Sequence, residues 1–338
     1  MIDGIISALK EHHIDVYRIN KRMTESVELF FIKKHLDMRR GTKVTEYEVT
    51  VYRDFESEGE SYRGSATVLI SAGMEAGEIA EKLKGAYYAA SFVKNRWYPL
   101  QKGEKVSCIE KKTNLSENWE KNALGMAEAI FSVDTREDVF LNSLEIFATR
   151  QEVQILNSEG VDVSYNRYIV SGEFVAQCLA PQDVETYESF RYDSFDEEDI
   201  KKKVERVLTM TKDRADASTA PPAGNYRVIL SGKYVSTLFD YYCSRAQAAY
   251  VYPGYSNYKV GDDVQMAGND APVSGERLNL SLAATVPYRV EGIPMIDRTL
   301  LSDGKLGLIF GGTRFCHYLG VEPTGNYEKI VAKEGSTS

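Results

Sequence analysis

The sequence predicts an α+β fold in two domains: an N-terminal α+β domain at residues 1–215, and a β-rich, barrel-like C-terminal domain at residues 225–338 that carries one helix. Three observations lead to this prediction. The chain has 338 residues, more than one domain usually contains. Helical and strand-like periodicities are interspersed over the first two thirds of the chain. The stretch Ala215–Gly224, rich in Ala and Pro, has the composition of a linker.

Apolar residues at helical spacing predict four helices in the N-terminal domain. They lie at residues 1–13, from Gly73 to Val93, at Trp119–Phe131, and after Ser194. The fourth has Ser194 and Glu197 three residues apart, which is the pattern of a capping box. In the C-terminal domain we expect one helix, over about residues 232–249, with Ser231 as its cap.

Strands are predicted where apolar and polar residues alternate or where β-prone residues form short runs. Short strands are expected at Glu46–Tyr52, Ala66–Ile70 and Arg227–Leu230. From Ser143 to Ala180 the chain is strand-like, with two hairpin turns expected at Asn157–Gly160 and Ser171-Gly172. Residues 99–116 are polar and predict a loop. Three glycines are expected at tight turns: Gly160, Gly292 and Gly325.

The composition argues against several classes of function. The net charge of −9 and the pI of about 5.2 disfavour nucleic acid as a ligand, because phosphate backbones attract basic faces. No run of 18 apolar residues could form a membrane span, and the N-terminus shows no secretory signal. The four cysteines are scattered, as in a protein kept reduced. We therefore expect a cytoplasmic protein.

Five short segments between Ser143 and Asn326 resemble, in the correct order, the TldD/PmbA family of metallopeptidase-related proteins, whose members are also described as modulators of DNA gyrase. The segments are Asn157–Val161, Tyr226–Leu230, Glu291–Pro294, Leu300–Leu306 and Tyr318–Asn326. One position departs from the family pattern: Arg289 stands where the family has Asp. Family members continue with further strands beyond this point, so we expect this chain to be naturally short or trimmed.

The resemblance implies a zinc site that this chain cannot build. Catalytic members carry His-Glu-x-x-x-His on the first helix of the C-terminal domain, where the histidines and a later cysteine bind the metal. The corresponding positions are Phe239, Asp240 and Ser244. Phenylalanine has no lone pair, serine is a poor zinc ligand, and no histidine occurs between His35 and His317. We therefore expect no metal, no cofactor and no catalytic residue, as in the non-catalytic, PmbA/TldE-like branch.

Other catalytic signals are weak. Cys316-His317 is the only adjacent Cys-His pair, and neighbouring residues on a strand point to opposite faces, which disfavours chelation of one ion. Neither a phosphate-binding loop nor a Gly-x-Ser-x-Gly motif is present. A peptidase or other hydrolase that uses Asp240 or Glu291 with a water molecule is the rival interpretation.

Tyrosines gather in and after the predicted C-terminal helix. They are Tyr241, Tyr242, Tyr250, Tyr252, Tyr255 and Tyr258. Core and interface packing would explain such a cluster. The functional alternative is a groove that holds an extended peptide by strand addition, with Tyr242, Tyr255, Ser256 and Glu291 as candidate lining residues.

The resemblance implies a protein that acts through contact with other chains. The first hypothesis is a non-catalytic partner subunit in peptide proteolysis or maturation, either as a homodimer or as a heterodimer with a catalytic family member. An unpaired sheet edge in the C-terminal domain would recruit such a partner. The alternatives are an active hydrolase with an unrecognised site and a stand-alone peptide-binding module.

Overall fold

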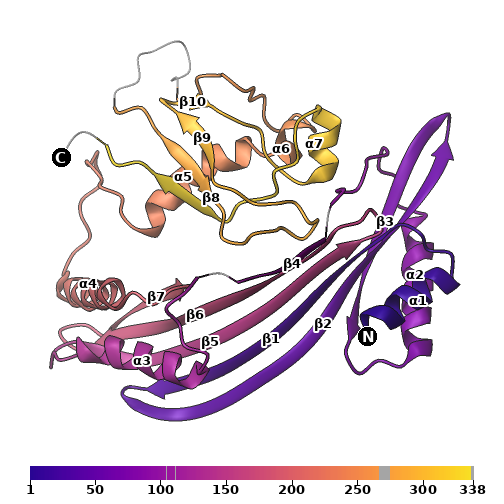
Figure 1. Cartoon of the computed structure of the whole chain (residues 1–338). Coiled ribbons are helices and arrows are strands. Elements are labelled where there is room, and N and C mark those ends of the chain that lie inside the picture. The colour runs from indigo at the N-terminus through magenta and orange to yellow at the C-terminus, as the bar shows by residue number, and fades with distance from the viewer. Residues whose placement is uncertain (104, 111, 266–274, 336–338) are drawn as a thin grey trace.

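The computed structural model describes residues 1–103, 105–110, 112–265 and 275–335. The fold is α+β, as predicted. A long, curled sheet carries helices on one side, and the C-terminal region lies above one end of this sheet on the other side (Figure 1). Between the two parts, residues 217–232 form neither helix nor strand, where the linker is expected.

In the described part of the chain, seven strands form the large sheet, in the order β3-β2-β1-β5-β6-β4, with β7 also paired to β6. The strands are β1 (Tyr17–Ile32), β2 (His35–Ser57), β3 (Glu60–Ser71), β4 (Lys105–Glu110), β5 (Phe140–Asn157), β6 (Asp162–Cys178) and β7 (Val184–Tyr192). Every pairing is antiparallel except that of β4 with β6. Strand β4 lies in the region for which we predicted a loop.

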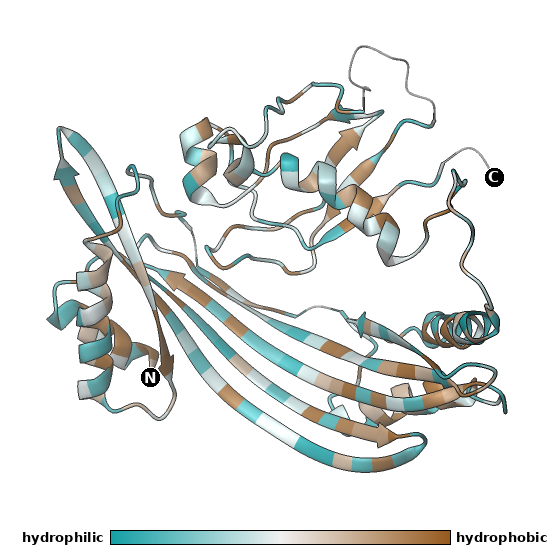
Figure 2. Ribbon diagram, turned by 180° about the vertical axis from the view of Figure 1, so that it is seen from behind, coloured by the Kyte–Doolittle hydropathy of each residue, from teal (hydrophilic) through white to brown (hydrophobic). Residues whose placement is uncertain are grey.

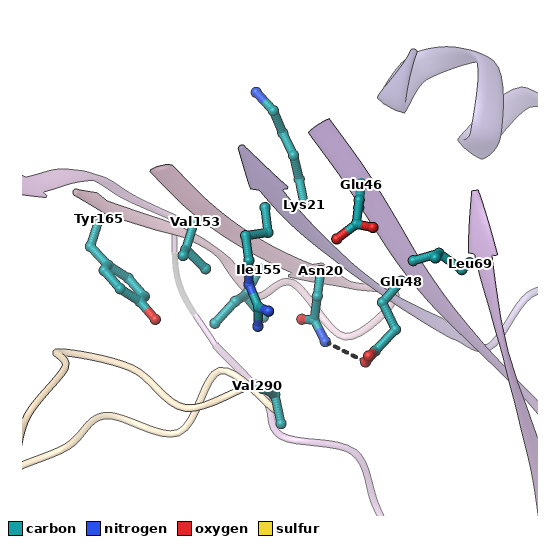
Figure 3. A pocket seen from close by; sticks show the side chains of 10 residues that line it. Asn20, Lys21, Glu46, Glu48, Leu69, Val153, Ile155, Tyr165 and Val290 are labelled. Atoms are coloured by element: carbon teal, nitrogen blue, oxygen red, sulfur yellow. Dashed lines mark hydrogen bonds between the residues drawn. The ribbon is translucent and has the colours of Figure 1, made fainter. Parts of the chain in front are cut away.

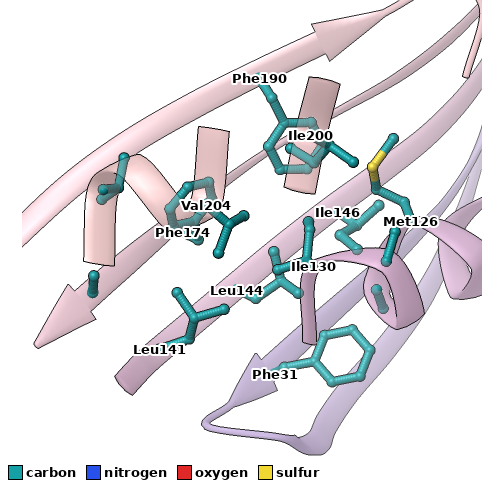
Figure 4. Close-up of a cluster of buried hydrophobic side chains, with 14 of the residues drawn as sticks. Phe31, Met126, Ile130, Leu141, Leu144, Ile146, Phe174, Phe190, Ile200 and Val204 are labelled. Atoms are coloured by element: carbon teal, nitrogen blue, oxygen red, sulfur yellow. The ribbon is translucent and has the colours of Figure 1, made fainter. Parts of the chain in front are cut away.

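Four helices cover one face of this sheet: α1 (Ile2–Glu11), α2 (Ala76–Ala90), α3 (Trp119–Ser132) and α4 (Glu197–Asp216). At one end, Ile19 of β1 packs in a core with α1 and α2. At the other end, Leu29 of β1 packs with α3 and α4 in the core that Figure 4 shows. Residues 19 and 29 are an even number of positions apart on one strand, so both cores lie on the same face.

The opposite face of the sheet carries the C-terminal region. Ile155 of β5 and Tyr165 of β6 pack there against Val286 and Met295. Figure 2 shows the sheet from the side opposite α3, where the strands run on beyond the C-terminal region without a helix over them. The side chains of Arg18 and Asn20 line pockets on this face.

The C-terminal region contains a small sheet of order β10-β9-β8-β11. Its elements are α5 (Lys233–Arg245), α6 (Ala248–Val251), β8 (Leu280–Ala283), β9 (Arg298–Ser302), β10 (Lys305–Leu306), α7 (Thr313–Leu319) and β11 (Lys329–Ala332). We expected one helix and a β-rich, barrel-like domain. Instead, the described residues hold three helices beside an open four-stranded sheet. Helix α7 was missed because its aromatic and β-branched residues are typical of strands.

Three local predictions were wrong for identifiable reasons. Strand β6 runs straight through Ser171-Gly172, because it pairs there with two strands: Gly172 is opposite Ile146 of β5 and opposite Phe190 of β7. Residues 227–230 form no strand in the structure. The cap of α4 is Asp196 rather than Ser194, and its carboxylate accepts a hydrogen bond from the Asp199 amide at 3.0 Å.

Several other predictions are confirmed. Helices α1, α2 and α3 lie within the predicted ranges, to within one residue, and the hairpin turn after Asn157 joins β5 to β6. Gly160, Gly292 and Gly325 have φ values of +93°, +80° and +74°, a region that favours glycine. None of the helices in the described residues combines the length and the apolar composition needed to cross a membrane.

Candidate functional site

A cavity of about 490 Å³ lies between the large sheet and the C-terminal region. The sheet contributes Arg18, Thr50, Tyr52, Ser65 and Thr67 to its wall, and the C-terminal region contributes Gln247, Arg289, Glu291, Arg314 and Asn326, among others. The sheet residues meet because of strand register: Arg18 is opposite Thr50, Thr50 is opposite Thr67, and Tyr52 is opposite Ser65. Opposed residues share one face of a sheet, so all five point toward the same space.

Hydroxyl groups and one guanidinium group line the sheet side of the cavity. Nη2 of Arg18 donates to Oγ1 of Thr50 at 3.2 Å, and the hydroxyls of Thr50 and Thr67 are 2.9 Å apart. Nε of Arg18 is buried and has no hydrogen-bond partner among the described residues. The Glu48 carboxylate lies 3.9 Å from Nη2 of Arg18 and is half exposed.

Two buried phenols complete this wall. Tyr52 is 5% exposed and Tyr98 is 6% exposed, and both line the cavity. Burial, with a smaller contribution from Tyr52, raises the pKa of Tyr98 to about 12. Burial also raises the pKa of Tyr52 above its ordinary value. Both phenols are therefore neutral hydrogen-bond donors at pH 7.

The C-terminal wall carries two further arginines and a carboxylate. Arg289 donates through Nη1 to Oε1 of Glu328 at 2.8 Å, and this hydrogen bond outweighs burial and lowers the pKa of Glu328. Oε2 of Glu291 accepts hydrogen bonds from the amide and the hydroxyl of Thr313. Arg314 donates through Nη1 to Oδ1 of Asn95 at 2.8 Å.

The segment of residues 95–97 holds the C-terminal region over strand β3. The Arg63 amide donates to the carbonyl of Asn95, and the Trp97 amide to the carbonyl of Ser61, both at 2.9 Å. The hydroxyl of Tyr318 on α7 donates to the carbonyl of Arg96. Together with the bond between Arg314 and Asn95, these contacts fix α7 beside the edge of the sheet.

A smaller pocket of about 90 Å³ adjoins the cavity, with Val290 as a shared lining residue (Figure 3). It lies over β1 and β2 and is lined by Asn20, Glu46 and Glu48, among others. Nδ2 of Asn20 donates to Oε1 of Glu48 at 3.2 Å. Polar groups therefore continue along this face of the sheet beyond the cavity.

The edge of β3 is open beside the cavity. The Arg63 amide points away from β2, toward Asn95. Backbone groups of alternate residues in an antiparallel strand point the same way, so those of Ser65 and Thr67 point away from β2 too. They pair with no other backbone group in the described ranges. Thr67 is exposed, and both residues also line the cavity.

Of the four groove residues that we predicted, only Glu291 lines this cavity. Tyr242 packs against the core of the C-terminal region. Tyr255 is 73% exposed and meets Tyr250 edge to face. Ser256 is buried, and its hydroxyl accepts a hydrogen bond from the Tyr258 amide at 3.3 Å. The structure does not bring these residues together.

The three residues that the resemblance assigns to a zinc motif have side chains that do not suit a zinc ion. Phe239 packs against the core of the C-terminal region, Asp240 is exposed, and Ser244 offers a hydroxyl. In the described residues, no group of three or more His, Cys, Asp and Glu side chains could hold a metal. Burial, followed by the charge of Asp240, raises the pKa of Cys243 to about 11, so this neighbouring thiol stays protonated.

Cys316 and His317 lie on helix α7, not on a strand as we expected. Cys316 is fully buried, and burial raises the pKa of its thiol to about 11. His317 is exposed, and its ring meets Trp97 edge to face. The two side chains therefore still point to different environments.

Sequence reasoning missed Arg18, Tyr52, Tyr98 and Arg314 as cavity residues, and it named Arg289 only as a departure from the family pattern. The first four belong to no local motif, because strand register and the 95–97 segment assemble them from distant parts of the chain. The available signal was Tyr52, a large aromatic residue at the end of a predicted strand, next to charged neighbours.

Residues 109–215 match the model of the PmbA/TldA metallopeptidase central domain. No curated protein matches the sequence significantly. Among solved structures, the chain is similar to a "putative modulator of a DNA gyrase" from Thermotoga maritima, with a TM-score of 0.69 and 17% identity, covering 96% of this chain and 73% of that one. At such identities, likeness to a solved structure establishes the fold.

Two further structures share this fold. TldE from Thermococcus kodakarensis has a TM-score of 0.67 and 14% identity, covering 99% of this chain and 78% of its own. A "putative modulator of DNA gyrase" from Bacteroides thetaiotaomicron has a TM-score of 0.70 and 15% identity, covering 99% and 77%. The chain therefore contains a PmbA/TldA metallopeptidase central domain at residues 109–215, and nearly its whole length shares the fold of these structures.

Proposed function

We propose that this chain is a non-catalytic, peptide-binding subunit that works with a zinc-bearing relative in the cytoplasm. The observation that carries the proposal is the environment of Phe239 on α5, where the resemblance places the first zinc-binding histidine. The ring of Phe239 packs against the core of the C-terminal region. Phe239 is therefore part of the hydrophobic packing of this region, and its side chain has no lone pair that could bind a metal.

The peptide-binding part of the proposal is supported by the cavity and the edge beside it. Ser65 and Thr67 offer backbone donors and acceptors at the open edge of β3, as strand addition requires. The same residues line a cavity of about 490 Å³, within the range of about 300–1,000 Å³ typical of ligand pockets. An extended peptide paired with β3 would therefore run along the mouth of the cavity.

The partner subunit is supported by exposed apolar side chains in residues 226–241. They are Tyr226, Val228, Ile229, Leu230, Tyr234, Leu238 and Tyr241. Such a concentration in and before α5 is typical of a surface that another chain covers. The partner is either a second copy of this chain or a zinc-bearing relative. A complex with a zinc-bearing relative would give this chain a role in proteolysis.

Metal content and activity test the proposal. Elemental analysis of protein purified without added metal should find far less than one zinc per chain, and unfolded casein should stay uncleaved. About one zinc per chain would overturn the non-catalytic assignment. Cleavage of casein that disappears in Asp240→Asn or Glu291→Gln would instead support the rival hydrolase. Co-expression with a catalytic family member should yield a complex, and failure to do so would leave a stand-alone peptide-binding module.

A further inference from the structure

The cavity wall presents hydrogen-bond donors that have no acceptor in the described part of the chain. Tyr52 and Tyr98 are more than nine-tenths buried and line the cavity, and neither hydroxyl makes a hydrogen bond there. Nε of Arg18 is likewise buried without a partner. A buried donor without an acceptor, such as Nε of Arg18, is unfavourable, and the two hydroxyls are free to donate into the cavity, so this wall is suited to a ligand that supplies acceptor atoms.

The charged groups of the C-terminal wall differ in how they are paired. Oε2 of Glu291, the carboxylate of the wall, already accepts two hydrogen bonds from Thr313. Arg314 donates to the amide oxygen of Asn95 and lies over the ring of Phe315, and it forms no ion pair with a described carboxylate. The positive charge of Arg314 is therefore available to an anionic ligand.

The balance of charge limits the ligand to a small anion. The wall carries the guanidinium groups of Arg18, Arg289 and Arg314. Glu328 offsets the charge of Arg289, and the half-exposed Glu48 offsets part of that of Arg18. With Glu291 also in the wall, the remaining excess is at most one positive charge. A monoanionic carboxylate suits this excess better than a phosphate dianion.

The position of the cavity indicates where the carboxylate comes from. Ser65 and Thr67 line the cavity and also carry the open edge of β3, so a peptide added to this edge would end beside the phenols. An N-terminal ammonium group would meet guanidinium groups and be repelled. We infer that the cavity binds the C-terminal carboxylate of a peptide, which accepts hydrogen bonds from Tyr52, Tyr98 and Arg18. This inference rests on the proposed peptide-binding function.

The carboxylate site is tested by fluorescence anisotropy with the whole chain and two labelled peptides. Both have the same uncharged sequence of alternating Thr and Val, which favours an extended conformation. One ends in a free carboxylate and the other in a carboxamide. The carboxylate peptide should bind about tenfold more tightly, because the amide loses the charge-assisted hydrogen bonds.

Two variants locate the carboxylate within the cavity. Tyr98→Phe removes one hydroxyl, and Arg18→Gln removes one guanidinium group. Each should weaken binding of the carboxylate peptide several-fold and leave the carboxamide peptide unchanged. Tyr62→Phe is the matched control, because the Tyr62 ring stacks on Phe55 outside the cavity. Melting temperatures establish that each variant is folded.

The outcomes separate this inference from the proposed function. Equal affinity for the two peptides would overturn the carboxylate site and leave peptide binding intact. A preference for the carboxylate that survives both Tyr98→Phe and Arg18→Gln would also overturn it, since the group would then bind elsewhere. If neither peptide binds the unsubstituted chain, the peptide-binding function fails together with the site.

Discussion

Oε2 of Glu291 accepts hydrogen bonds from both the amide and the hydroxyl of Thr313, at 2.9 and 3.2 Å. Thr313 is the first residue of helix α7, whose first amides have no partner within the helix. A residue that is distant in sequence thus caps the helix that contacts the 95–97 segment. Glu291, which we predicted as a groove residue, lines the cavity and also holds part of its wall in place.

Removal of this carboxylate should destabilise the chain. We expect Glu291→Ala to lower the free energy of unfolding by about 1 kcal/mol, the usual loss for a helix cap. Urea denaturation followed by circular dichroism measures the change. Glu322→Ala is the control, because its carboxylate is mostly exposed and makes one long contact, 3.4 Å, with Arg298. Equal stability of the two variants would contradict a capping role for Glu291.

The pair of Arg63 and Asp54 should make stability depend on pH. Burial favours the neutral carboxyl group, but the hydrogen bonds and charge of Arg63 outweigh it and lower the pKa of Asp54. Because the folded value lies below the unfolded value of about 3.9, the stabilising effect is complete only well above that unfolded value, from about pH 5 upward. It is lost as the pH falls through the lowered folded value.

The measurement is the melting temperature of the chain and of Asp54→Asn between pH 7 and pH 2.5. The variant should melt at a lower temperature near neutral pH, and the difference should shrink below pH 4. Asp138→Asn is the matched control, since its partner Arg136 is 37% exposed whereas Arg63 is 5% exposed, so that solvent screens the pair of Asp138 and Arg136 more strongly. A difference between the chain and Asp54→Asn that stays constant with pH would argue against this linkage.

Two glycines should respond in opposite ways to a larger side chain. Gly292 has a φ of +80°, and a Cβ there would lie 2.5 Å from Cγ1 of Val161. Gly292→Val should therefore cost about 2 kcal/mol or more. Gly85 is exposed within helix α2, and a Cβ there would meet nothing within 4 Å. Gly85→Ala should stabilise by about 0.5–1 kcal/mol. Thermal unfolding of both variants tests the two expectations. A Gly292→Val variant with the same melting temperature as the unsubstituted chain would refute the tight turn.

Sequence patterns predicted the helices and turns that depend on interactions between residues close in the sequence. The apolar stripe of Ile5 and Leu9 predicts α1, and the turn residues around Gly160 predict the β5–β6 hairpin. Helix α7 is capped by the distant Glu291, and β6 continues through Gly172 because it pairs there with both β5 and β7. Both effects come from residues that are distant in the sequence. The local sequence of α7 therefore favours a strand, and that of Ser171-Gly172 favours a turn.

The cavity lay beyond prediction for a related reason. Arg18, Tyr52 and Tyr98 come from separate segments and meet only through the register of β1 with β2 and the 95–97 segment. A sequence motif requires fixed spacing along the chain, and this site has none. By contrast, a zinc motif has fixed spacing within one helix, which is why the resemblance could assign Phe239, Asp240 and Ser244 to it, and that assignment stays a prediction.

Limited proteolysis of the monomeric chain should cut first between α4 and α5, because a partner on residues 226–241 would protect this stretch. Residues 217–232 form no regular structure and are exposed. Arg227 lies in this stretch, and brief trypsin treatment should yield two fragments that separate there. Arg227→Gln should slow this cleavage strongly. Preferential cutting within residues 143–180 would contradict the predicted domain boundary.

The last prediction concerns the partner surface around α5. Ile229 is 95% exposed, and Leu238 and Tyr241 on α5 also face solvent. We expect light scattering to show a dimer, or co-expression with a catalytic relative to give a heterodimer, and we expect Ile229→Glu to weaken either complex at least tenfold. The charged side chain would have to lose its hydration in the interface, whereas in a monomer it would stay in water and leave the melting temperature unchanged. Leu179→Glu, an exposed apolar position outside this surface, is the control and should leave association intact. A chain that stays monomeric at tens of micromolar, roughly the range of weak association, and that also fails to bind a catalytic relative would refute the partner role.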